Sequence, residues 1–159
     1  MNLISHRGNI IGPNPNRENS PSYIDTAISA GYEVEVDINY VNGKIYLGHD
    51  TPDYEITEKW IMIRKNSVWF HCKNLEAATK LSALCDGYKF FCHTSDSFVL
   101  TSNGYIWVHD LDMSLDDRCI IPLLNSEDVT KYSGKIVYGV CTDYVTLAEY
   151  KLKQKGLYR

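Results

Sequence analysis

The chain has 159 residues, of which 44% are hydrophobic and 23% charged, and its formal net charge at pH 7 is −4. This composition is typical of a globular protein, so we expect one domain over residues 1–159. The negative charge argues against a nucleic-acid partner, and the lack of a membrane-length apolar run argues against membrane insertion. Five cysteines without a C-x-x-C pair, and an N-terminus unlike a signal peptide, favour free thiols and the cytoplasm.

The N-terminal residues predict a strand, a loop and a helix. Residues 3–6 form a short apolar run, and a loop rich in Gly, Asn and Pro follows it. We expect the helix to begin at Pro21, with Ser20 as its cap, and to end at Gly31.

Residues 32–40 predict the clearest strand of the chain. Apolar side chains occupy the even positions, whereas Glu33, Glu35 and Asp37 share the other face. Asn42 and Gly43 then predict a two-residue hairpin turn into a second strand at 44–47.

The rest of the chain continues the alternation of strands and helices. We expect strands at 67–71, 88–93, 105–109, 119–121 and 136–141, and helices at 74–85 and 146–154. This order predicts an α/β protein with a parallel barrel or open sheet, some of whose helices are trimmed. His6, His71, His93 and His109 end predicted strands, and parallel barrels build active sites at that face, which favours one shared site.

Glu35 and Asp37 are candidate metal ligands. Two residues apart on one strand face, their side chains emerge on the same side, about 7 Å from each other. Buried together they would repel unless a cation or a proton intervened, and carboxylate oxygens suit Mg or Ca. The alternative is a half-exposed strand whose polar face, Glu33 included, meets water.

His6 and Arg7 are candidates for acid-base chemistry and for phosphate binding, because an imidazole titrates near neutral pH and a guanidinium grips two phosphate oxygens. A surface pair at a strand end is the alternative, as is a solvated charge for Glu18. Strict hairpin register sets His49 on the face away from Glu35, so it joins the site only if the strand departs from that register. Gly48 offers the place for such a bend.

These motifs together resemble a known family. The pattern consists of His6-Arg7-Gly8, Glu18-Asn19-Ser20, Glu35-Val36-Asp37 and Gly48-His49-Asp50. In order and spacing it is similar to the N-terminal signature of the glycerophosphodiester phosphodiesterases, within the phosphatidylinositol phospholipase C-like barrels. Residues 139–144 are similar to that family's final-strand motif.

The resemblance implies a small TIM-type barrel that hydrolyses a small-molecule phosphodiester with a divalent metal. The implied roles are metal ligands for Glu35 and Asp37, acid and base for His6 and His49, phosphate binding for Arg7 and Lys73, and support for Glu18 and Asp50.

The chain departs from the family pattern at two points. His71 stands where the family has a third acidic ligand, two residues before the lysine. As a ligand His71 would favour Mn, Zn or Fe over Mg or Ca, whereas the alternative is an ordinary histidine at a strand end. The chain is also shorter than the ~250 residues of such barrels. We therefore expect a barrel with few helices that is either incomplete or closed by a partner chain. In the second case the protein would be a homo-oligomer.

Two other functions remain open from the sequence. A shortened barrel that lacks the third carboxylate could bind a phosphate or phosphodiester without turnover. An enzyme of the phospholipase C or sphingomyelinase D type would act on lipid head groups, but no amphipathic or basic membrane-docking segment is evident.

Overall fold

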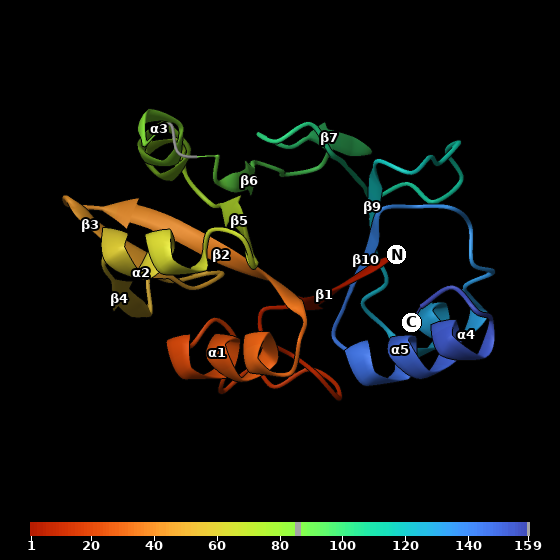
Figure 1. Cartoon of the computed structure of the whole chain (residues 1–159). Helices are drawn as coiled ribbons and strands as arrows, with labels where there is room; N and C mark the ends of the chain where they lie inside the picture. The colour runs from red at the N-terminus through yellow and green to blue at the C-terminus, as the bar shows by residue number, and fades with distance from the viewer. Residues whose placement is uncertain (85–86, 159) are drawn as a thin grey trace.

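Ten strands form one sheet in the computed structural model, which describes residues 1–84 and 87–158 (Figure 1). The strands are β1 (Asn2–His6), β2 (Glu33–Val41), β3 (Lys44–Leu47), β4 (Tyr54–Ile56), β5 (Val68–Cys72), β6 (Lys89–Phe91), β7 (Phe98–Leu100), β8 (Ile106–Val108), β9 (Cys119–Pro122) and β10 (Gly139–Thr142). The helices are α1 (Pro21–Ser29), α2 (Glu58–Arg64), α3 (Leu75–Ala83), α4 (Ser126–Lys131) and α5 (Val145–Gln154).

Seven strands run parallel, in the order β6-β5-β2-β1-β10-β9-β8. The sheet curls, so that β5 and β6 lie across an interior from β9 and β10 (Figure 1). β7 pairs antiparallel with β8, and the backbone N–H of Ser102, just after β7, donates to the carbonyl of Phe90 on β6 at 2.9 Å. The fold is thus mixed α/β, a curled barrel-like sheet with few helices, as the sequence predicts.

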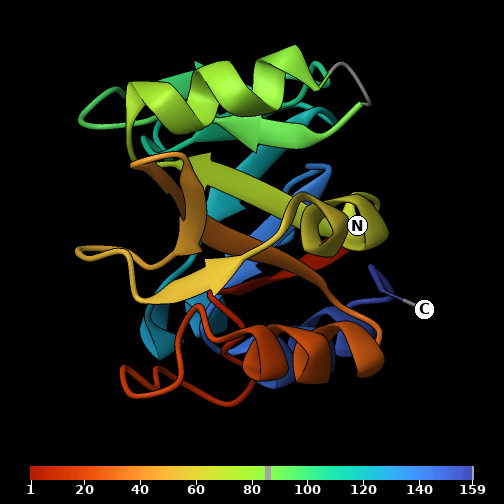
Figure 2. The same ribbon diagram turned by 90° about the vertical axis from the view of Figure 1, so that its left-hand side faces the viewer.

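The helices pack against the outer face of the curled sheet. Figures 1 and 2 show α1 below β2 and α3 above β5. Val34, Val36 and Ile38 of β2 join one buried apolar cluster with residues of α1, α2 and α3. Outward side chains of β1, β9 and β10 join a second cluster with α4 and α5. Burial of these faces holds the helices to the barrel.

The inner face of the sheet begins with a layer of large apolar side chains. Its buried members are Ile4, Trp69, Phe91, Trp107, Ile120 and Cys141. Because side chains alternate between the two faces of a strand, the residue two positions further along each strand also points inward. This second inward layer holds the polar groups of the site.

Most of the predicted elements are confirmed. The hairpin turn has Asn42 and Gly43 at φ 51° and 80°, the left-handed pair that a tight turn of this type requires. α1 begins at Pro21, although the Ser20 side chain makes no capping hydrogen bond. The sequence did not predict β4, β7, α2 or α4. The helix predicted at 74–85 corresponds to α3, and its predicted end at Cys85 lies outside the described residues.

Candidate active site

Polar side chains form the second inward layer of the barrel, above the apolar one. They come from four strands or strand ends, and the residues are His6, Glu35, Asp37, His71, Lys73 and Asp143. Because the strands are parallel, their carboxyl ends bring these groups to one rim.

Glu35, Asp37 and His71 form the centre of this layer. One ligand atom of each lies within 4.8 Å of the others, and Glu35 and Asp37 are only 2% and 0% exposed. The alternative of a solvent-facing strand is therefore wrong, because the polar face of β2 faces the barrel interior. The alternation of polar and apolar residues in the sequence does not tell a face turned to such an interior from a face turned to solvent.

These three residues fit a divalent cation. Glu35 Oε2 and Asp37 Oδ1 are buried and have no well-formed hydrogen bond within the described part of the chain. Nδ1 of His71 lies 3.5 Å from Glu35 Oε1 and 3.2 Å from Asp37 Oδ1, at ion-pair distance. Two buried carboxylates with unused oxygens facing an imidazole are a suitable donor set for Mn, Zn or Fe, and also accommodate Mg.

Asp37 is held by several neighbouring groups. Its Oδ2 lies 2.8 Å from Arg7 Nε and accepts a hydrogen bond of 3.0 Å from the side-chain amide of Asn19. Lys73 Nζ lies 3.7 Å from Oδ1. Burial raises the pKa of Asp37, but the nearby His71 imidazole, Arg7 and Asn19 outweigh burial and hold the pKa well below its usual range. Asp37 is therefore an anion, available as a ligand.

His71 is protonated at neutral pH when no metal is bound. Burial lowers its pKa, but Asp37 and Glu35 outweigh burial and raise the pKa to about 9. The ring stacks on Phe91, with centroids 4.8 Å apart and planes 8° from parallel. This stacking orients the imidazole toward the two carboxylates.

His6 is paired with Asp143, which follows β10. Nδ1 of His6 lies 2.8 Å from Asp143 Oδ1, and its Nε2 lies 3.8 Å from Glu35 Oε2. Burial lowers the pKa of His6, but the hydrogen bond to Asp143 and the charge of Glu35 outweigh burial and raise it. The arrangement orients one imidazole nitrogen toward the carboxylate cluster.

The loop between β1 and α1 supports this arrangement. Glu18 accepts a hydrogen bond from Arg7 Nη1 at 3.2 Å and another from the Asn9 amide at 2.9 Å. The same amide donates to Asp143 Oδ1 at 2.7 Å. Arg7 and Asn19 have left-handed φ values of 54° and 61°. Contacts with Glu18 and Asp37 hold Arg7, and two hydrogen bonds with Asp37 hold Asn19.

The structure places His49 and Asp50 apart from these contacts. β3 ends at Leu47, and Gly48 has φ 145°; a Cβ there would lie 2.0 Å from the carbonyl oxygen of Thr51, so only glycine fits. The chain leaves the strand at this glycine, which is the position that the sequence offers for a bend. His49 Nδ1 lies 2.7 Å from Asp50 Oδ1, and its side chain is 38% exposed.

A cavity of about 170 Å³ opens beside the cluster. Its charged and polar lining residues are His6, Arg7, Glu35, His71 and His109, and the rest of the lining consists of Phe91, Trp107, Pro122, Leu124 and Cys141. The charged groups can receive a phosphate, and the apolar side chains can receive the group attached to it.

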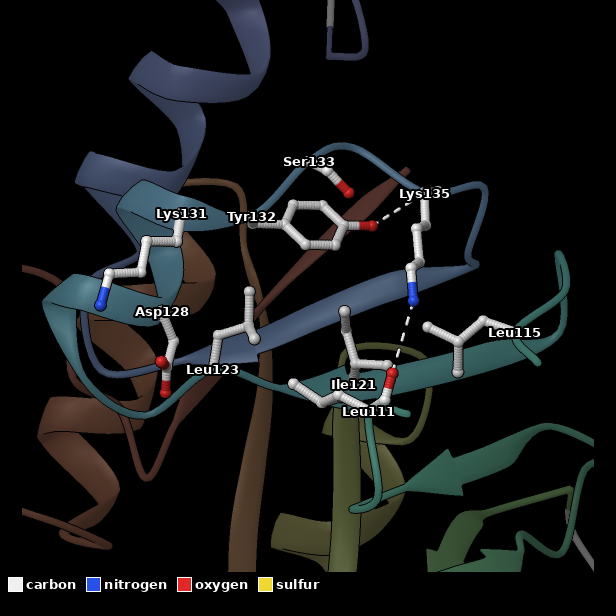
Figure 3. Close-up of a pocket in the computed structure, with 9 residues that line it drawn as sticks. All are labelled: Leu111, Leu115, Ile121, Leu123, Asp128, Lys131, Tyr132, Ser133 and Lys135. Atoms are coloured by element: carbon white, nitrogen blue, oxygen red, sulfur yellow. Dashed lines mark hydrogen bonds between the residues drawn. The ribbon is translucent and has the colours of Figure 1, made fainter. Parts of the chain in front are cut away.

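A separate cavity of about 220 Å³ lies by β9 and α4 (Figure 3). Leu111, Leu115, Ile121 and Leu123 form its apolar wall, and the ammonium group of Lys135 donates to the carbonyl of Leu111 at 3.4 Å. Among the described residues it shares no lining residue with the cavity beside His6, and it contains a single carboxylate, Asp128, and no imidazole.

The sequence assigns no role to Asp143, and it predicts His109 only as one of four strand-end histidines at a shared site. Asp143 and His109 each lie two positions beyond a buried inward residue, Cys141 and Trp107, so inward parity is the signal that identifies them. Asn9 and Asn19 lie in a loop, where no such periodicity exists.

No helix of the described residues is long and apolar enough to cross a membrane. No family model and no curated protein matches the sequence. Among solved structures, the chain matches the crystal structure of glycerophosphodiester phosphodiesterase from Agrobacterium tumefaciens str. C58, with a TM-score of 0.51 and 10% sequence identity. The match covers 93% of this chain and 97% of that chain. The protein thus has the TIM-type fold of a glycerophosphodiester phosphodiesterase, with few helices.

Proposed function

We propose that this chain is a metal-dependent phosphodiesterase that hydrolyses a small, glycerophosphodiester-like molecule. The observation that carries the proposal is the buried cluster of Glu35, Asp37 and His71, beside the His6–Asp143 pair. The fold shared with a glycerophosphodiester phosphodiesterase supports the same reaction class. The four described cysteines are free thiols, which suits the reducing cytoplasm that we propose as its location.

Glu35, Asp37 and His71 would hold the divalent cation. When bound, the cation supplies charge neutralisation and polarisation of the phosphate. The carboxylates alone would favour Mg or Ca, whereas the imidazole moves the preference toward Mn or Zn.

His6 is the proton-transfer group that the geometry supports best. Asp143 accepts a hydrogen bond from the Nδ1–H of His6. The other ring nitrogen, Nε2, then takes a proton from the attacking hydroxyl or water, or gives one to the leaving oxygen. Arg7 and Lys73 add positive charge beside Asp37 and steady the phosphate as negative charge develops. His49 stays the candidate for the second proton transfer, with Asp50 as the partner of its ring.

The proposal is tested by product release. Purified protein with Mn²⁺ is incubated with glycerophosphocholine or with bis(4-nitrophenyl) phosphate, with EDTA as the metal-free control. We expect metal-dependent release of a phosphomonoester, abolished in His6→Ala and Glu35→Ala while the circular dichroism spectrum stays native. Near-normal turnover in either variant would refute the assignment.

A non-catalytic phosphodiester-binding barrel is the second candidate, favoured by His71 in place of the family's third carboxylate. Such a protein would show thermal stabilisation by metal and ligand but no product.

A further inference from the structure

His93 and His109 form a pair that the proposed mechanism leaves unused. His93 follows β6 and His109 follows β8, the two ends of the parallel series of strands. Their rings stack with centroids 3.6 Å apart and planes 12° from parallel. The backbone N–H of His109 also donates to the carbonyl of Ser97 at 2.8 Å, so both the backbone and the ring of His109 are held in place.

His109 lines the same cavity as His6 and Glu35. The lining of this cavity also includes the apolar side chains Phe91, Trp107, Pro122 and Leu124. These four side chains offer apolar surface, and the Trp107 ring stacks on Phe91 at 4.4 Å. Beside these apolar side chains, the imidazole of His109 can both donate and accept a hydrogen bond.

We propose that His109 is a substrate-contacting residue that determines specificity: its imidazole hydrogen-bonds a free hydroxyl of the alcohol whose phosphate binds beside Glu35, Asp37 and His71. This assignment rests on the proposed function, and it adds to that function a residue that contacts the alcohol. The substrate is expected to carry at least one hydroxyl on a small carbon skeleton whose apolar face lies on Trp107.

The state of the ring suits this role. Burial and the neighbouring His93 lower the pKa of His109 to about 4, so the imidazole is neutral at pH 7, with one N–H and one lone pair. Its Nε2 is buried and without a hydrogen-bond partner among the described residues. An imidazole with an unpaired buried nitrogen keeps unused hydrogen-bonding capacity.

His49 does not offer the same contact in this structure. Its ring lies against Asp50, its side chain is 38% exposed, and it is not among the residues that line the cavity. Of these two histidines, therefore, His109 after β8 lines the cavity, and His49 after β3 does not.

The test is a binding cycle with two phosphomonoesters of equal charge. Glycerol 3-phosphate carries two free hydroxyls, whereas propyl phosphate has the same carbon count and none. Both are titrated by calorimetry into the Mn²⁺-loaded wild type, His109→Phe and His109→Gln. Phe keeps a ring that can stack on His93 but cannot hydrogen-bond, and Gln keeps hydrogen-bonding groups. Thermal melts establish that each variant is folded.

We expect His109→Phe to weaken glycerol 3-phosphate about tenfold, the size of one hydrogen bond to a buried group, and to leave propyl phosphate unchanged. His109→Gln should recover part of the loss. Equal weakening of both ligands, or of neither, would overturn the assignment, because it would make His109 a structural residue.

The outcomes separate this assignment from the proposed function. If the wild type binds both ligands with the expected difference but releases no product from any diester, hydrolysis fails and the His109 contact stands. If the wild type binds neither ligand, the His109 contact is overturned, whatever the result of the hydrolysis assay.

Discussion

His6 and Asp143 are hydrogen-bonded at 2.8 Å although 137 positions separate them in the chain. β1 and β10 are neighbouring parallel strands, with Ser5 paired to Thr142, so the next residue of each strand emerges at the same rim. The first parallel strand in the chain thereby supplies the imidazole of His6, and the last is followed by Asp143, whose carboxylate orients it. We expect this pair to be essential for proton transfer.

Asp143→Asn should lower kcat/KM by about a hundredfold or more, because an amide cannot stabilise the protonated imidazole. Loss of the carboxylate should also lower the pKa of His6, so the pH profile of kcat should move to lower pH. Asp25→Asn is the matched control, since its carboxylate pairs with Arg64 outside the cavity. Equal activity of the two variants, with unchanged pH profiles, would remove Asp143 from the mechanism.

Glu35→Gln should weaken Mn²⁺ binding by at least about a hundredfold, because an amide oxygen carries no charge to hold the cation. Glu33→Gln is the matched control on the same strand face, since Glu33 instead bonds Lys89 and Trp69. Calorimetric titration with Mn²⁺ measures both. Comparable affinity in the Glu35 and Glu33 variants would place the metal elsewhere.

Metal-free protein should lose stability as the pH rises from 6.5 to about 9. The pKa of His71 is raised from 6.5 to about 9, so its protonated form stabilises the fold fully below pH 6.5 and the contribution is lost as the pH passes 9. The loss is about 3 kcal/mol at most. Urea unfolding with EDTA at several pH values measures it. His71→Gln should show a flatter dependence, and parallel curves would contradict the raised pKa.

Asn19→Ala should destabilise the protein by roughly 2–4 kcal/mol. It removes two hydrogen bonds of 3.0 Å to Asp37 and puts alanine in a left-handed conformation at φ 61°. Asn42→Ala is the control, because Asn42 has φ 51° in an exposed turn, so it isolates the backbone cost of about 1 kcal/mol. Equal losses in urea unfolding would mean that the bonds to Asp37 contribute nothing.

Local patterns in the sequence were sufficient for the strands and the hairpin that build the site. The alternation in β2 predicts that Glu35 and Asp37 share a face, and Asn42-Gly43 predicts the turn that follows. Whether that face is solvated depends on the curl of the sheet, which encloses an interior between β5 and β6 on one side and β9 and β10 on the other. A single strand contains no such information.

The missed elements are short. α4 has six residues and α2 has seven, and β4 and β7 have three each, too few to show a period. The Asn9 contact with Asp143 depends on a loop and on the pairing of β1 with β10, which only the assembled barrel establishes. The inward parity of His109, in contrast, follows from Trp107 once the interior layer is known.

The location of a bound metal tests the central claim most directly. Crystals soaked in Mn²⁺ and measured at the manganese absorption edge should show an anomalous peak between the carboxylates of Glu35 and Asp37, with an imidazole nitrogen of His71 in its coordination shell. A peak at another place would contradict the account. So would the absence of a peak, with His71 still in ion-pair contact with Glu35 and Asp37.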